Sequence, residues 1–259
     1  MDQPLKLGVP RPGRLLALFA LLTTGSFAMP QQVAASPPLS ADQIMARVAS
    51  MNEVRTQKLL GYTSIRTYHL ESHGLVSRKA DMVVRAEFRA PDTKEFTVVS
   101  ESGSATIRNR VFRQLLQAEL QSMTAVNQRR TELTPENYRF QLVSQPGMGN
   151  DNVYVLDVQP KIDNKFLFSG RIWVDASDFA VTRIEGKPAT NPSWWTLRTD
   201  FTRQYERVGE FWFPETTRSV TRVRVFGTAV MTIDDRQYQI SQPGDSTVSE
   251  VSVPPPGSP

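Results

Sequence analysis

The sequence predicts a mainly β protein of the α+β class, built as a curved antiparallel sheet or incomplete β-barrel with two helices covering its concave face. Apolar and polar residues alternate in about nine or ten stretches, which is typical of half-buried strands. The turns between these stretches are short enough for hairpins, which favours antiparallel neighbours. Two other stretches repeat their apolar residues every three or four positions, as amphipathic helices do. A curled sheet needs such helices to cover the apolar side chains of its concave face.

The first 35 residues have the composition of a secretory signal peptide. Three basic residues precede the uninterrupted apolar run Leu15–Leu22, and the small residues Ala28 and Ala35 end two segments that suit a cleavage site. The run is too short for a membrane span, which needs about 20 apolar residues. We therefore expect a cleaved leader, with cleavage after Ala28 or Ala35, and an exported, soluble mature chain.

Two helices are expected, over residues 41–58 and 105–123. The first follows Ser40, a favourable N-cap residue, and repeats its apolar residues at spacings of four and three. The second has a broad apolar face that includes Leu116, while several arginines occupy its other side. Each helix therefore has an apolar face to bury against the sheet.

Period-two alternation begins after Gly61 and returns through the second half of the chain. An early strand over residues 82–89 is followed by a turn at residues 90–93 and a return strand, which together predict a hairpin. Everything after Pro135 has the pattern of strands, and the last three are expected at residues 196–208, 211–224 and 225–240. We expect one domain over residues 36–241 and a disordered Pro-rich tail over residues 242–259.

If the helices do not fill the whole concave side of the curled sheet, an apolar cavity remains. Such a cavity is the usual place for a lipid-like ligand. The residues expected to line it are Val84, Phe88, Phe96, Val98, Leu116, Phe140, Leu142, Val153, Val155, Phe168, Ile172 and Val174. Trp194 and Trp195 follow a turn, so their rings either pack on the sheet or lie at the rim of the cavity, in contact with a lipid or a partner.

The charge balance argues against nucleic acid as a partner. The formal net charge is +4, with 30 basic and 26 acidic residues, and removal of the leader lowers it to +2 because the leader holds three basic residues and one acidic residue. The chain has no cysteine, which excludes disulfides, thiolate chemistry, Cys-ligated metal and a lipid anchor on the chain itself.

His69 and His73 are the only histidines, and in a strand they could share a face with Glu71. A metal site needs a defined number and geometry of ligands, and no further ligand is evident, so we expect neither a metal nor a cofactor.

Carboxylates and serines offer no better catalytic set. We interpret the pairs Asp175 with Asp178 and Asp234 with Asp235 as turn residues, because Asp favours turns through local backbone hydrogen bonds. The serines between residues 100 and 104 lack the glycine pattern of a nucleophile elbow. The sequence therefore predicts no enzyme.

Arginines are frequent in the last third of the chain. We interpret most of them as solvated residues of the outer face, and a basic patch that contacts anionic lipid or an acidic partner is the alternative. They are Arg198, Arg203, Arg207, Arg218, Arg222 and Arg224.

Four segments of the chain resemble a known family. Gly170–Asp175 and Phe179–Gly186 are similar to paired strands of the outer-membrane lipoprotein-sorting superfamily, which is LolA/LolB-like and includes the RseB/MucB amino-terminal domain. Leu133–Phe140 resembles the start of the family's strand after the second helix, and Phe211–Pro214 resembles the segment that leads to its last hairpin. The resemblance covers the whole mature chain in the order of its elements.

This resemblance implies an unclosed barrel that accepts the acyl chains of lipoproteins, or another lipid, in the periplasm of a Gram-negative type envelope. The implied function is that of a monomeric carrier in lipoprotein sorting. An inner-membrane lipoprotein exporter would deliver the cargo to it, and an outer-membrane acceptor would take the cargo over. The alternative is a sensor or regulatory binding module of the RseB/MucB type, which usually has a further domain after the barrel.

Overall fold

A computed structural model describes residues 38–243, apart from residues 75, 125–128, 130, 148–151, 165, 191–195 and 225–226. The expected leader and nearly all of the expected tail therefore lie outside the described residues.

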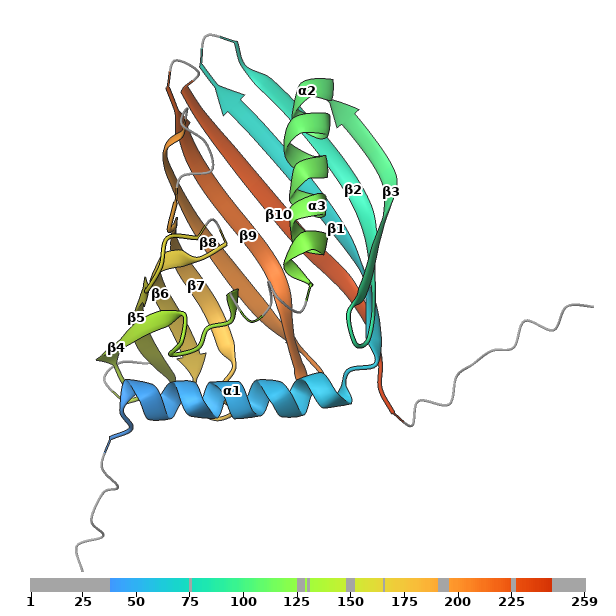
Figure 1. The fold of residues 1–259 in the computed structure, drawn as a ribbon. Coiled ribbons are helices and arrows are strands. Elements are labelled where there is room, and N and C mark those ends of the chain that lie inside the picture. Colours follow the sequence, from blue (N-terminus) through green and yellow to red (C-terminus); the bar gives the residue numbers. More distant parts are fainter. Residues whose placement is uncertain are drawn as a thin grey trace, which may run out of the picture. The chain divides into compact units, whose positions relative to one another are not determined.

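Within the described residues, ten strands form one antiparallel sheet, in the spatial order β3-β2-β1-β10-β9-β8-β7-β6-β5-β4 (Figure 1). The first and last strands of this order, β3 and β4, are not paired with each other, so the sheet is unclosed. The strands are β1 (Gly61–His73), β2 (Arg78–Arg89), β3 (Thr93–Gly103), β4 (Tyr138–Ser144), β5 (Val153–Pro160), β6 (Phe168–Asp175), β7 (Val181–Pro188), β8 (Thr196–Val208), β9 (Phe211–Val223) and β10 (Gly227–Ser241). The predicted fold class is confirmed.

The first expected helix is α1 (Ala41–Lys58). It begins with a capping box, in which the Ser40 hydroxyl accepts from the backbone N–H of Gln43 and the Gln43 side chain accepts from the backbone N–H of Ser40. Figure 1 shows α1 lying across one end of the sheet.

The second expected helix has three parts, α2 (Ala105–Ile107), a π-helical turn (Arg108–Phe112) and α3 (Arg113–Ser122). The wider turn is a local departure from the α-helical spacing that the sequence predicts. Figure 1 shows this helix running along the sheet beside β1 and β2.

The helices cover two separate apolar clusters on the same face of the sheet. Ile44, Met45 and Val48 of α1 pack on β4 to β7, where Leu156 and Ile172 are fully buried. The other cluster joins Phe112 and Leu116 of the second helix to buried residues of β1 and β2, such as Tyr68 and Met82. Each helix thus buries the concave face of its own part of the sheet.

Candidate functional site

The middle of the concave face, between the two clusters, is polar. Arg66 on β1 lies directly opposite Asp235 on β10, and Thr217 on β9 lies opposite Arg203 on β8. Residues directly opposite each other in neighbouring strands share a face, and Arg66 lies two positions before the buried Tyr68, on the same face of β1. The strand register therefore brings charged side chains into the concave face.

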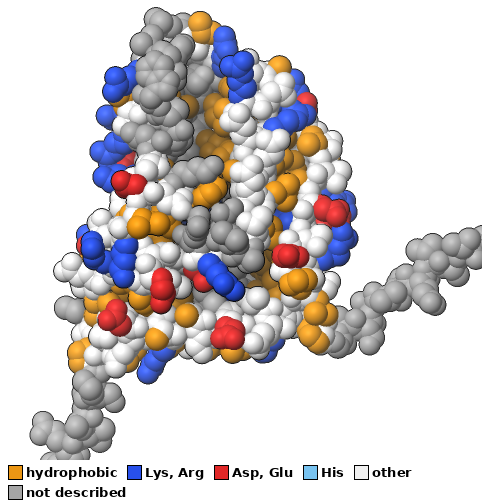
Figure 2. Space-filling view, in the orientation of Figure 1, with side chains coloured by type: hydrophobic (Ala, Val, Ile, Leu, Met, Phe, Trp, Pro, Cys, Tyr) orange, Lys and Arg blue, Asp and Glu red, His pale blue; other side chains and the backbone are white. Residues whose placement is uncertain are grey.

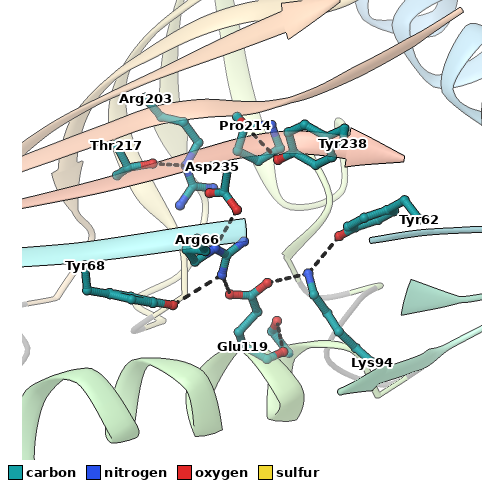
Figure 3. A network of polar contacts seen from close by, with 11 residues as sticks. Tyr62, Arg66, Tyr68, Lys94, Glu119, Arg203, Pro214, Thr217, Asp235 and Tyr238 are labelled. Carbon is teal, nitrogen blue, oxygen red and sulfur yellow. Dashed lines mark hydrogen bonds and ion pairs between the residues drawn. The ribbon is translucent and has the colours of Figure 1, made fainter. Parts of the chain in front are cut away.

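Arg66 is the centre of a buried network of polar contacts (Figure 3). Its Nε donates to Asp235 Oδ1 at 2.7 Å, and its Nη1 donates to Glu119 Oε2 at 2.5 Å. Lys94 Nζ donates to the other oxygen of Glu119 at 2.5 Å and to the Tyr62 hydroxyl at 2.9 Å. Since Glu119 belongs to α3 and the other groups belong to the sheet, the network ties this helix to the sheet.

Burial and charge act in opposite directions on these groups. Burial alone would raise the pKa of Glu119, but the charges of Arg66 and Lys94 outweigh it and lower that pKa from 4.5 to about 2. Burial raises the pKa of Asp235 even though Arg66 lies beside it. Glu119 is therefore the carboxylate that keeps its negative charge most firmly.

A cavity of about 390 Å³ lies next to this network, between α3 and the strands β8, β9, β10 and β1. Its charged and hydroxyl groups come from Arg66, Arg203, Thr217 and Asp235 of the sheet and from Glu119 and Ser122 of the helix. The rest of the lining is mostly apolar and includes Leu115, Ala118, Phe166, Pro214 and Ile233. The space-filling view shows hydrophobic side chains exposed on this face beside the second helix, among scattered charged residues (Figure 2). We call the cavity of about 390 Å³ the polar cavity.

A second cavity of about 370 Å³ lies beneath the carboxyl-terminal half of α1. No residue of this half of the helix is fully buried, because the buried residues of α1 are Ile44, Met45 and Val48. Most of the lining of the cavity is apolar. From the sheet it includes Val181, Ile184, Tyr205, Phe211 and Phe213, and from α1 it includes Asn52, Arg55 and Thr56. We call this space the apolar cavity.

Arg55 fixes α1 over the edge of the apolar cavity. Its Nη2 donates to the backbone oxygen of Asp178 at 2.6 Å and lies 3.4 Å from the Asp178 carboxylate. The same carboxylate accepts from Trp212 Nε1 at 2.8 Å. Asp178 thus holds the helix and β9 together where the cavity begins.

The two cavities are neighbours on the concave face. Arg203, which lines the polar cavity, and Tyr205, which lines the apolar cavity, lie two positions apart on the same face of β8. That spacing corresponds to roughly 7 Å along a strand. The arrangement offers an apolar space and a charged space side by side.

The residues expected to line a cavity have several environments. Val84, Ile172 and Val174 are fully buried in the clusters, and Leu116 is nearly so. Phe96, Phe140, Leu142 and Phe168 are partly buried and pack against the clusters, and the ring of Phe88 contacts Tyr62. None of these residues lines the polar or the apolar cavity, so their role in binding stays a prediction.

The structure corrects the expected position of two residues of β5. Val153 and Val155 lie on the opposite face of β5 from Leu156 and Val158, which are the residues buried in the cluster. Val155 lies opposite Trp173 of β6, on the outer face of the sheet. Both faces of β5 carry apolar residues, so the alternation alone did not decide which face is buried.

Val98 shares the face of Val84 but is 41 % exposed, because it belongs to β3 at the edge of the sheet. Trp194 and Trp195 lie outside the described residues.

Sequence reasoning missed the charged residues of the concave face. Asp235 is not a turn residue: it lies within β10 and is 3 % exposed. Arg203 is not a solvated residue of the outer face, since it lines the polar cavity. The signal that could have found both is their phase in the alternation, which places them with the inward-facing residues of their strands. Asp175 agrees with the prediction, because its carboxylate accepts from the backbone N–H groups of Ser177 and Asp178 in the turn.

The histidines lie on the outer face of the sheet. His69 Nδ1 contacts Asp81 Oδ1 at 2.6 Å, and this hydrogen bond raises the pKa of His69. Within the described residues, no group of three or more His, Asp or Glu side chains is placed to hold a metal ion. In the same part of the chain, no helix combines the length and the apolar composition that are needed to cross a bilayer.

Comparison with known proteins gives similar folds at low sequence identity. No protein-family model matches the chain, and no curated protein sequence matches it. The chain is similar to the crystal structure of a DUF1329 family protein from Desulfovibrio piger, with 12 % identity, 82 % of this chain and 96 % of that chain covered, and a TM-score of 0.40.

Two other similar structures carry the name of the superfamily that the strand segments resemble. One is a putative outer membrane lipoprotein-sorting protein domain from Vibrio parahaemolyticus, with 10 % identity, 78 % and 93 % of the two chains covered, and a TM-score of 0.39. The other is a LolA superfamily protein from Nitrosomonas europaea, with 10 % identity, 79 % and 95 % covered, and a TM-score of 0.36.

Proposed function

We propose that this chain is a periplasmic carrier that holds an acyl chain of a lipid or lipoprotein in the apolar cavity, without covalent chemistry, as part of outer-membrane lipoprotein sorting. In this role the leader delivers the chain to the periplasm. An inner-membrane exporter then supplies the cargo, and an outer-membrane acceptor receives it.

The observation that carries the proposal is the apolar cavity beneath α1. Its volume of about 370 Å³ lies in the range of small-ligand sites. Burial contributes roughly 0.8 kcal/mol per methylene, so about ten buried methylenes contribute roughly 8 kcal/mol before the cost of association. Such contacts are non-directional, which suits a carrier that must release its cargo.

A substitution that fills the cavity tests the proposal. Thr56 lines the apolar cavity from α1 and its side chain is exposed at the helix surface, so Thr56→Trp places an indole in the space without removing a core residue. We expect Thr56→Trp to reduce the affinity for a fluorescent acyl probe by at least about tenfold, because several methylenes lose their place. Gln57→Trp is the matched control, since Gln57 is the next residue of the same helix, is exposed and lines neither cavity.

The proposal is wrong if the probe fails to bind to the wild type, or if it binds equally to the wild type and to folded Thr56→Trp. Native mass spectrometry of protein purified from the periplasm distinguishes the carrier from the alternative, a regulatory binding module of the RseB/MucB type. A bound lipid supports the carrier, whereas a lipid-free protein with a stoichiometric protein partner favours the regulatory module.

A further inference from the structure

Arg203 is a cation of the polar cavity that forms no ion pair among the described residues. Its Nε donates to the Thr217 hydroxyl at 3.1 Å, which is a neutral partner. The carboxylates of Glu119 and Asp235 are instead engaged by Arg66 and Lys94. In the described part of the chain, no carboxylate forms an ion pair with Arg203. The lining holds two cations and two carboxylates, and with Lys94, which lies beside the cavity, three cations share these two carboxylates.

The guanidinium group of Arg203 is suited to bind an anion. A guanidinium has five N–H donors in a planar fork, and the hydrogen bond to Thr217 uses one of them. The outer fork matches the two oxygens of a carboxylate or a phosphate, and charged hydrogen bonds of this kind are stronger than neutral ones. A half-buried site with lower polarity than water strengthens them further.

We propose that Arg203 binds the anionic head group, a phosphate or a carboxylate, of an acyl amphiphile whose chain lies in the apolar cavity. The inference rests on the proposed function, because it adds a head-group site to the acyl site. Arg203 and Tyr205 are two positions apart on one face of β8, so a head group at Arg203 places the start of its chain at the wall of the apolar cavity. The hydroxyls of Ser122 and Thr217 lie in the same polar cavity as further hydrogen-bonding groups.

The first test compares two ligands with the same acyl chain on the wild-type protein. A monoacyl lysophosphatidic acid carries a phosphate, and the corresponding monoacylglycerol does not. We expect the phosphate ligand to bind on the order of tenfold to a hundredfold more tightly, as a charged hydrogen-bonding pair implies. Equal affinities overturn the head-group site and leave the proposed function standing. Failure of both ligands to bind overturns the proposed function itself.

The second test removes the guanidinium. Arg203→Gln is expected to remove most of the preference for the phosphate ligand, and Arg203→Lys is expected to keep part of it, because lysine keeps the charge without the fork. Arg218→Gln is the matched control: it removes the same charge from β9, where Arg218 lies opposite Thr202 on the outer face. A preference that survives in folded Arg203→Gln, or that Arg218→Gln removes equally, overturns the assignment. If Arg203→Gln does not fold, Arg203→Lys and the comparison of the two ligands on the wild type still test the head-group site. An unchanged preference in folded Arg203→Lys then contradicts the role of the guanidinium fork.

Inorganic phosphate separates a lipid head group from a free anion. We expect phosphate at concentrations near those of the lysolipid to leave lysolipid binding unchanged, because it lacks the acyl chain. If inorganic phosphate alone binds as tightly as the lysolipid, the site is one for a free anion and the amphiphile proposal is wrong.

Discussion

Glu119 is a single residue on which two buried cations depend. Its two oxygens accept from Arg66 and from Lys94, and the side chains of both cations are 8 % exposed. Glu119→Gln leaves Lys94 without its ion-pair partner and Arg66 with Asp235 alone, and the loss of one partner from a buried pair costs roughly 3–5 kcal/mol. We expect a decrease of that size in the free energy of unfolding at neutral pH, measured by urea denaturation. Glu210→Gln is the control: Glu210 pairs with Lys58 at the exposed surface, so little change is expected.

The pH dependence gives a second readout of the same residue. The pKa of Glu119 is lowered from 4.5 to about 2 in the folded chain. A lowered carboxyl pKa contributes stability that is complete above the unfolded value, and the contribution is lost as the pH falls through the folded value. The difference in unfolding free energy between wild type and Glu119→Gln should therefore shrink as the pH falls from about 4.5 toward about 2. A difference that stays constant over this interval contradicts the assigned ion pairs.

Individual residues of the polar cavity were the least predictable part of the site. Arg66 and Asp235 are 169 residues apart in the sequence, and only the pairing of β1 with β10 places them opposite each other. Arg203 lies among other arginines that face outward, such as Arg218. Composition cannot separate these residues, because the face of a charged side chain depends on the strand register.

At the scale of elements, α3 packs on the sheet through one face only. Leu116 is 8 % exposed in the cluster with Phe112 and Tyr68, whereas Leu120, one turn later, is 40 % exposed. We expect Leu116→Ala to lower the free energy of unfolding by roughly 2–5 kcal/mol, through lost burial and the cavity that remains. Leu120→Ala is the control on the same helix, with an expected change within about 0.5 kcal/mol. Equal effects in chemical denaturation would show that the second helix does not pack as described.

The elements themselves could be predicted from local chemistry. Ser40 and Gln43 form the capping box that begins α1, and the apolar spacing of this helix places Ile44 and Val48 on the buried face. The burial of β5 could not be predicted in the same way, because Val155 and Leu156 are both apolar and only the pairing with β6 decides between them. Local patterns give the kind of element, and pairing gives the face that is buried.

At the scale of the whole described sheet, hairpin lengths predict neighbouring antiparallel strands but not the division of its concave face. The sequence predicted one apolar face, and the structure has two apolar clusters with a polar cavity between them. The last strand, β10, returns to pair with β1, so strands from the beginning and the end of the described chain lie side by side, and this pairing places Arg66 opposite Asp235. This long-range pairing leaves no local trace in the sequence.

The separation of the clusters predicts additive energetics. Ile44 belongs to the cluster under α1 and Leu116 to the cluster under α3, and the two clusters share no buried residue. Ile44→Val should lower the free energy of unfolding by roughly 0.5–1.5 kcal/mol, and combined with Leu116→Ala the effects should add within about 0.5 kcal/mol. All ten strands are hydrogen-bonded in one sheet, so the double variant should still unfold in a single transition. A coupling energy above about 1 kcal/mol, or two separate transitions in urea, would show that the polar cavity either links the clusters or divides the sheet into independent parts.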